Sequence, residues 1–168
     1  MQIAARNGSI AMLALIRQHG GSLDSRGPKG DGLFHLAAYN GHLDTMRWLQ
    51  NNGIDTAAVD SSGQSAGHVA AKRGEPRILL YLRDEINADF SLMDHAGQCF
   101  ADCIPRYAED EERKVKLEYC RKIATSAVAK NVKRAKKGDD IAIMQLEEEN
   151  GPINLHNNNS NAIFLDTS

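Results

Sequence analysis

One segment of the chain decides its fold. It reads Gly32-Leu33-Phe34-His35-Leu36-Ala37-Ala38-Tyr39-Asn40-Gly41-His42-Leu43. A shorter copy of this pattern follows 33 residues later, as Gly67-His68-Val69-Ala70-Ala71-Lys72-Arg73-Gly74. Recurrence at a fixed interval of this length indicates a protein built from structural repeats, in which each unit packs on its neighbours.

The same period extends back to the start of the chain. An offset of 33 residues aligns small residues with small residues and apolar residues with apolar ones. The matching columns are Ala4/Ala37/Ala70, Ala5/Ala38/Ala71, Gly8/Gly41/Gly74, Leu13/Met46/Leu79, Leu15/Trp48/Tyr81 and Ile16/Leu49/Leu82, and His35 aligns with His68. Agreement in so many columns at one offset predicts units stacked in register.

Each unit is predicted to form two short helices. Gly41 suits the left-handed position that ends a helix, and Leu43, Met46 and Leu49 then form one apolar stripe of a second helix. Pro76 stands at the start of the equivalent helix in the next unit, where its missing N–H is not needed. We expect the helix pairs, with their turns on one side, at about residues 1–19, 33–52 and 66–86.

The repeated segment resembles the ankyrin-repeat family, whose unit of about 33 residues is a turn and two antiparallel helices. Both copies are similar to the family's TPLHLAAxxGHL segment. Where the family has Thr-Pro, this chain has Gly32-Leu33 and then Ser65-Ala66, so we expect Ser65 to replace the threonine cap in the second copy. The resemblance implies an all-α fold: an ankyrin-type α-solenoid of three to four repeats with a C-terminal helical extension.

The resemblance covers residues 1–105. The first repeat is truncated and has Gln2 in the histidine column. The last repeat opens at Asp94, one residue late, and is degenerate, because Asp102 takes the histidine column and Pro105 an alanine column.

Two further segments follow the array. Residues 106–137 contain neither Gly nor Pro, and their apolar residues recur at helical spacing from Leu117 to Val128, which predicts a helical cap with a basic end. Residues 138–168 are acidic and rich in Asn, which predicts a largely disordered tail.

Composition narrows the class of protein further. The chain has 168 residues and a formal net charge of −2, the size of one domain. Its apolar runs fall far short of the roughly 20 residues that cross a bilayer, and Cys99, Cys103 and Cys120 form no CxxC pair. We therefore expect a soluble protein of a reducing compartment, the cytoplasm with the nucleus as the alternative, and no membrane partner.

The sequence offers no set of residues for catalysis. It has no recognisable nucleophile elbow and no Gly-rich phosphate loop. In the family that the chain resembles, the column of His35 and His68 is structural, and its imidazole bonds the backbone of a neighbouring turn. His95, Cys99 and Cys103 would share one face of an unbroken helix, but Gly97 interrupts it. We expect no catalytic residue, no bound metal, no cofactor and no small-molecule substrate.

The resemblance implies a non-catalytic protein–protein interaction module, an adaptor or scaffold. Its partner protein is expected to contact the turn tips and the exposed positions that follow the alanine pairs. These residues are Lys29, Asp31, Tyr39, Asn40, Ser61, Ser62, Gln64, Lys72, Arg73, His95 and Gln98. The alternative is a fragment of a larger ankyrin-containing signalling or nuclear regulatory protein, and a metal-binding or enzymatic protein is the least favoured interpretation.

A basic run forms the end of the predicted cap. Lys133, Arg134, Lys136 and Lys137 match a short nuclear-import pattern. A solvated helix face is the competing interpretation. Contact with nucleic acid is disfavoured, because the run contains no aromatic residue for base stacking and the rest of the chain is not basic.

Overall fold

Three pairs of helices and one longer helix form residues 1–129, the part of the chain that this structure, a computed structural model, describes. The pairs are α1 (Gln2–Arg6) with α2 (Ile10–Gln18), α3 (Leu33–Tyr39) with α4 (Leu43–Asn51), and α5 (Ala66–Arg73) with α6 (Pro76–Asp84). The longer helix spans residues 111–129. The predicted import residues Lys133, Arg134, Lys136 and Lys137 and the predicted tail, residues 138–168, lie outside the described residues.

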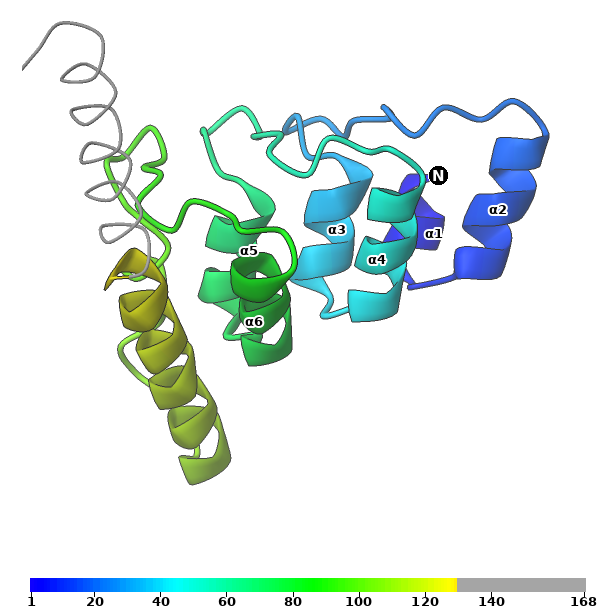
Figure 1. Ribbon diagram of the computed structural model, residues 1–168. Coiled ribbons are helices and arrows are strands. Elements are labelled where there is room, and N and C mark those ends of the chain that lie inside the picture. The colour runs from blue at the N-terminus through cyan, green and yellow to red at the C-terminus, as the bar shows by residue number, and fades with distance from the viewer. Residues whose placement is uncertain (130–168) are drawn as a thin grey trace, which may run out of the picture. The chain divides into compact units, whose positions relative to one another are not determined.

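The helix pairs follow one another in a row, with the turns that join successive pairs on one side (Figure 1). Helix α3 packs against both α1 and α5, and each second helix packs against the first helix of its own pair. Residues 1–129 contain no strand, only two isolated bridges at the turns, Arg26 with Gly32 and Val59 with Ser65. The all-α repeat fold predicted from the 33-residue period is confirmed.

The alanine columns form the contact between neighbouring first helices. Ala5, Ala38 and Ala71 are each 0 % exposed. Side chains this small let the helices approach closely, and a larger residue would force them apart because the interior is already close-packed. The second helices add one large apolar side chain each, Leu13, Met46 and Leu79, and these are also fully buried.

The last unit forms its turn but not its first helix. Residues 100–103 form a turn in place of a helix, and Phe100 fills the space beside α5. The Phe100 ring lies edge-on to His68 at 4.5 Å between centroids and 4.8 Å from the Phe90 ring. A Cβ on Gly67 would come within 2.0 Å of the Phe100 ring, so the glycine makes room for it.

The terminal helix begins five residues later than the predicted extension. Asp110 sets its start, because its Oδ1 accepts a hydrogen bond from the Arg113 N–H at 2.6 Å. One face of this helix is buried against the array. The buried residues are Leu117, Cys120, Ile123, Ala124 and Ala127.

Leu117 occupies a position that the repeats define. In each unit the glycine after the first helix faces a side chain of the following unit: Gly8 faces His42, and Gly41 faces Glu75. Gly74 faces Leu117 instead, which would lie 2.6 Å from a Cβ at that position. The terminal helix therefore fills the place that the next repeat would take.

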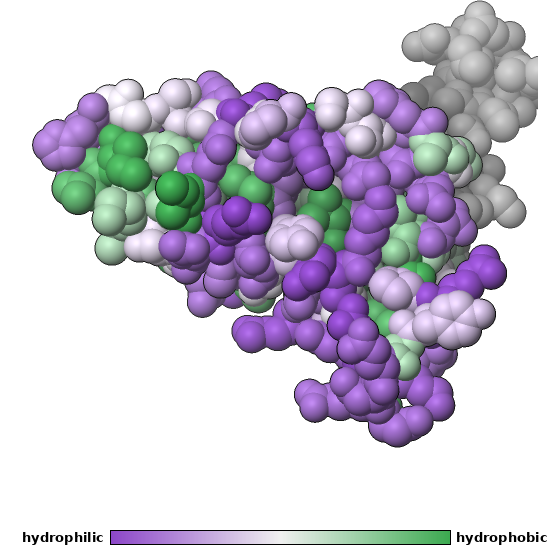
Figure 2. All heavy atoms as spheres, turned by 180° about the vertical axis from the view of Figure 1, so that it is seen from behind, coloured by the Kyte–Doolittle hydropathy of each residue, from purple (hydrophilic) through white to green (hydrophobic). Residues whose placement is uncertain are grey.

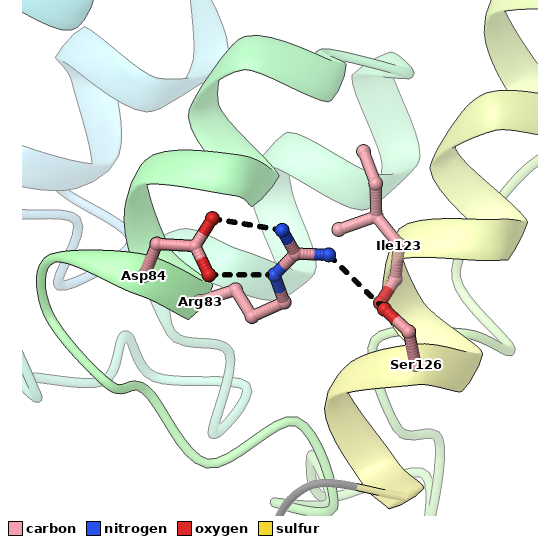
Figure 3. Close-up of polar contacts among 4 residues, drawn as sticks. All are labelled: Arg83, Asp84, Ile123 and Ser126. Carbon is pink, nitrogen blue, oxygen red and sulfur yellow. Dashed lines mark hydrogen bonds and ion pairs between the residues drawn. The ribbon is translucent and has the colours of Figure 1, made fainter.

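Polar contacts join the terminal helix to α6 (Figure 3). The Arg83 guanidinium forms two 2.8 Å hydrogen bonds to the Asp84 carboxylate and a third, of 3.1 Å, to the Ser126 hydroxyl. That hydroxyl donates in turn to the Ile123 carbonyl. Ion pairs this close to solvent contribute at most about 1 kcal/mol, so we assign most of the stabilisation to the buried apolar face.

Replacing Leu117 with alanine is expected to lower the free energy of unfolding by about 2–5 kcal/mol, the cost of removing a buried leucine side chain. Val115→Ala is the matched control, because Val115 lies on the same helix but is 68 % exposed, and a surface change of this kind costs less than about 0.5 kcal/mol. Urea unfolding followed by circular dichroism measures both. Equal losses would show that the terminal helix does not cover the array.

Candidate partner-binding groove

A buried histidine hydrogen-bonds the start of its own helix and the turn of the following unit, as the contacts of His35 show. Its Nδ1 accepts a hydrogen bond from the Gly32 N–H at the start of α3, at 3.4 Å. Its Nε2 lies 2.9 Å from the carbonyl oxygen of Gln64, in the following turn, and donates to it. The imidazole thus completes its own helix start and holds the next unit, as expected for this column.

His68 repeats the arrangement one unit later. Its Nδ1 accepts from the Ser65 N–H at 3.1 Å, and its Nε2 donates to the Gln98 carbonyl at 3.1 Å. Ser65 stands at the N-cap of α5 and forms a capping box with His68, so it takes the place of the family's threonine. Its hydroxyl also lies 3.1 Å from the same Nδ1 and supports the ring.

Both imidazoles are held in the neutral form. Burial lowers the pKa of His35 and of His68, which are 2 % and 0 % exposed. The hydrogen bonds add a geometric reason, since a proton on Nδ1 would point at a backbone N–H. The tautomer that fits is the one with its proton on Nε2.

The two ends of the array modify this arrangement. In the first unit the Gln2 amide reaches the Ser25 hydroxyl of the following turn at 3.4 Å. In the last unit the Asp102 carboxylate accepts from the Cys99 N–H at 3.1 Å. This bond corresponds to the one that each histidine accepts from the backbone N–H three residues before it. Hydrogen bonds from the Cys99 thiol and backbone lower the pKa of Asp102.

Neighbouring turn tips bond directly to one another. The N–H and hydroxyl of Ser61 donate to the Lys29 carbonyl at 3.0 and 2.7 Å, and the His95 N–H donates to the Ser62 carbonyl at 2.9 Å. Within its own tip, the Asp60 carboxylate accepts from the backbone N–H groups of Ser62 and Gln64. The tips are therefore held as one edge.

A groove of about 430 Å³ lies between this edge and the first helices. We call it the tip groove. Its lining residues are Arg6, Pro28, Lys29, Asp31, His35, Leu36, Tyr39, Asp60, Gln64 and Val69. Four of the predicted partner-binding residues, Lys29, Asp31, Tyr39 and Gln64, are thus brought together.

Tyr39 and Arg73 lie together on the side of the groove formed by the helix ends. The Arg73 guanidinium stacks over the Tyr39 ring, with its central carbon 4.5 Å from the ring centroid. Tyr39 is nevertheless 43 % exposed. The pair presents a flat aromatic surface and a cation in a fixed relation to the groove.

The other predicted residues lie elsewhere. Ser61 and Ser62 are exposed, but their hydrogen bonds hold neighbouring tips together. Asn40 is exposed and uses its side-chain amide on the Leu36 carbonyl. His95 and Gln98 lie on the third tip, outside the lining of the groove.

Arg6 lines the groove although it was absent from the prediction. It occupies the same column as Tyr39 and Lys72, the position directly after each alanine pair. The 33-residue period therefore places Arg6 of the truncated first unit in the same column as two residues that were predicted to bind a partner.

The family model for ankyrin repeats, in three copies, matches residues 1–94. The chain belongs to the ankyrin-repeat family. The matched residues include all three helix pairs and end at Asp94, where the turn of the last unit begins.

Curated relatives share the ankyrin segment. The chain is 36 % identical over 61 residues to Notch-regulated ankyrin repeat-containing protein B of Danio rerio, a match that covers 36 % of this chain and 55 % of that protein. It is 33 % identical over 85 residues to Notch-regulated ankyrin repeat-containing protein of Xenopus laevis, covering 48 % and 75 %. A 37 % identical stretch of 62 residues in the L-asparaginase of Dirofilaria immitis covers 37 % of this chain and only 10 % of that protein.

The ankyrin array also exposes apolar side chains at its α1 and α2 end (Figure 2). Ile3 is 77 % exposed, and Met12 and Leu15 are about half exposed at 48 % and 49 %. A hollow of about 620 Å³ at this end is lined by two of these side chains, Ile3 and Met12, together with Met1 and Ile16.

Two of the three thiols, Cys103 in the last unit and Cys120 on the terminal helix, are buried. Burial raises the pKa of Cys103 and raises that of Cys120 to about 11, so neither supplies much thiolate at neutral pH. Residues 95–103 form turns, which separates His95, Cys99 and Cys103 from a common helix face. No group of three or more His, Cys, Asp and Glu side chains in residues 1–129 could hold a metal ion. Nor is any helix in that range long and apolar enough to cross a membrane.

Stability is expected to fall as the pH falls through the histidine range. The folded pKa values of His35 and His68 are lowered below the unfolded value of about 6.5. The unfolded chain therefore binds more protons below that pH, and the free energy of unfolding decreases from pH 7.5 toward 5.5. Urea unfolding at several pH values measures the slope.

His68→Gln serves as the comparison for this slope. The variant is expected to be less stable than the parent at pH 7.5, because the hydrogen bond to the Gln98 carbonyl is weakened. It should lose less stability than the parent between pH 7.5 and 5.5, because it lacks the imidazole that becomes protonated. An unchanged slope in the variant would show that the imidazole of His68 does not carry the pH dependence.

Proposed function

We propose that the chain is a non-catalytic adaptor or scaffold that holds a partner protein in the tip groove. Ankyrin repeats are protein-interaction modules, so membership in the family supports the general role. The proposal adds the surface: the tip groove, with Tyr39 and Arg73 beside it as anchors.

The observation that carries this proposal is the stacked pair of Tyr39 and Arg73. Tyrosine and arginine are the residue types that most often dominate binding energy at protein interfaces. Because the two side chains already restrain each other, a partner that contacts them pays less conformational entropy than it would for two free side chains.

A second candidate is that the array belongs to a larger ankyrin-containing signalling or nuclear regulatory protein. The observation that favours it is the exposed apolar end formed by Ile3, Met12 and Leu15. The buried faces between units show what such a surface accepts, namely another helix pair. The tip groove remains available in either case, so the two candidates differ in the context of the module and not in its binding surface.

Replacing both Tyr39 and Arg73 with alanine is expected to weaken partner capture at least about tenfold, since each removes an anchor worth more than about 1 kcal/mol. The far-ultraviolet circular dichroism and the melting temperature should stay close to those of the parent, because both side chains are exposed. Quantitative mass spectrometry of proteins captured on the immobilised full chain measures the effect.

The matched control replaces Tyr119 and Arg113 with alanine. Both are exposed on the terminal helix, Tyr119 at 49 %, and neither lines the tip groove. Proteins lost from the groove variant but kept by the control support the proposal. If the two variants capture the same proteins as the parent, the tip groove is not the binding surface.

A further inference from the structure

We propose that the tip groove selects an acidic, extended segment of its partner. This inference rests on the proposed function, since it names the chemistry of the partner for that same groove. The observations that carry it are an apolar floor and four cations, two in the lining of the groove and two beside it at the end of α5.

Several cations elsewhere in the array are engaged by other groups of the fold. Arg26 donates to the carbonyls of Gly30 and Val59, Arg47 pairs with Glu85, and Arg83 pairs with Asp84. By contrast, four cations at the groove have no ion pair within residues 1–129. They are Arg6 and Lys29 in the groove lining, and Lys72 and Arg73 at the end of α5. Arg73 contacts the Tyr39 ring, a contact that leaves its charge uncompensated.

The carboxylates nearby are engaged by the fold. Asp60 accepts two backbone hydrogen bonds in its own turn, at 2.8 and 2.9 Å. Asp94 accepts from the backbone of Ala96 and Gln98 and from the Gln64 amide. Asp31 also lines the groove, and its carboxylate lies against Gly27 within its own turn. Hydrogen bonds hold Asp60 and Asp94 in their turns but do not remove their charge. The four cations in and beside the groove still outnumber the two carboxylates of its lining, Asp31 and Asp60, which leaves an excess of positive charge for a ligand.

The floor between the charges is apolar. Leu36 and Val69 line it and are each partly exposed, with the Tyr39 ring alongside. A ligand that fits therefore carries carboxylates along its length and at least one apolar side chain pointing into the groove. Charge complementarity of this kind sets partner choice and speeds association.

The spacing of the cations sets the length of the segment. Packed helices lie roughly 8–10 Å apart, so the two steps from α1 across α3 to α5 span about 16–20 Å. An extended chain advances about 3.3 Å per residue and crosses this span with about six residues. A folded acidic domain would meet fewer of the cations at once than an extended segment does.

The experiment is a selection of phage-displayed random 12-residue peptides on the full chain, with each selected peptide then remeasured as a synthetic probe. The proposal predicts that peptides whose binding is lost in Tyr39→Ala are strongly enriched in Asp and Glu and carry an apolar residue among them. Their affinity should fall as salt is raised, because exposed charges are screened.

A neutralised variant tests the cations directly against a control with the same change in charge. The groove variant changes Arg6, Lys29, Lys72 and Arg73 to Gln, and the control changes Arg106, Arg113, Lys114 and Lys122 to Gln. The groove variant should weaken the acidic peptides at least about tenfold, and the control by less than about twofold. Circular dichroism confirms that both remain folded.

The outcomes separate this inference from the proposed function. The inference of an acidic segment is wrong if the Tyr39-dependent peptides are neutral or basic, or if neutralising the groove cations leaves their affinity unchanged. In either case the groove remains a binding surface. If no selected peptide depends on Tyr39, the proposed function fails and this inference fails with it.

Discussion

A neutral imidazole with two fixed hydrogen bonds is the interaction on which the rest of the array depends. At His35 and His68 one ring nitrogen accepts from the start of its own helix, and the other donates to a carbonyl of the next turn. The first contact fixes where a helix begins, and the second fixes the next unit relative to it. Because the same ring makes both contacts, the register of each helix and the position of the following turn tip are set together.

The tip groove is a consequence of this arrangement. Its lining includes His35 and Gln64, which are joined by the ring hydrogen bond, and Lys29, whose carbonyl is held by Ser61. The surface proposed to bind a partner is therefore built on contacts between units, and a unit alone would not form it. This explains how a fold stabilised by small, buried alanines presents a shaped and charged surface.

The period in the sequence was enough to predict the helix pairs, because they repeat, and the resemblance to the ankyrin family added the role of the alanine and histidine columns. Features that occur once were harder to place. Leu117 lies outside the period, so the sequence indicated an apolar stripe on the terminal helix but not that Leu117 packs against Gly74. Asp110 starts the terminal helix where no Gly or Pro marks a boundary. Ser65 starts α5 as its spacing predicted, but the sequence did not show that its hydroxyl also contacts the Nδ1 of His68.

The ring contacts can be observed directly, by a long-range proton–nitrogen correlation spectrum of the full chain with ¹⁵N-labelled histidine at pH 7. The spectrum reports which ring nitrogen carries the proton. The account predicts that His35 and His68, assigned by single substitution, both show a protonated Nε2 and an unprotonated Nδ1, with a slowly exchanging Nε2–H. A proton on Nδ1 in either ring, or averaging between the two tautomers, would contradict it, because the ring could not then accept at one helix start while donating to the next turn.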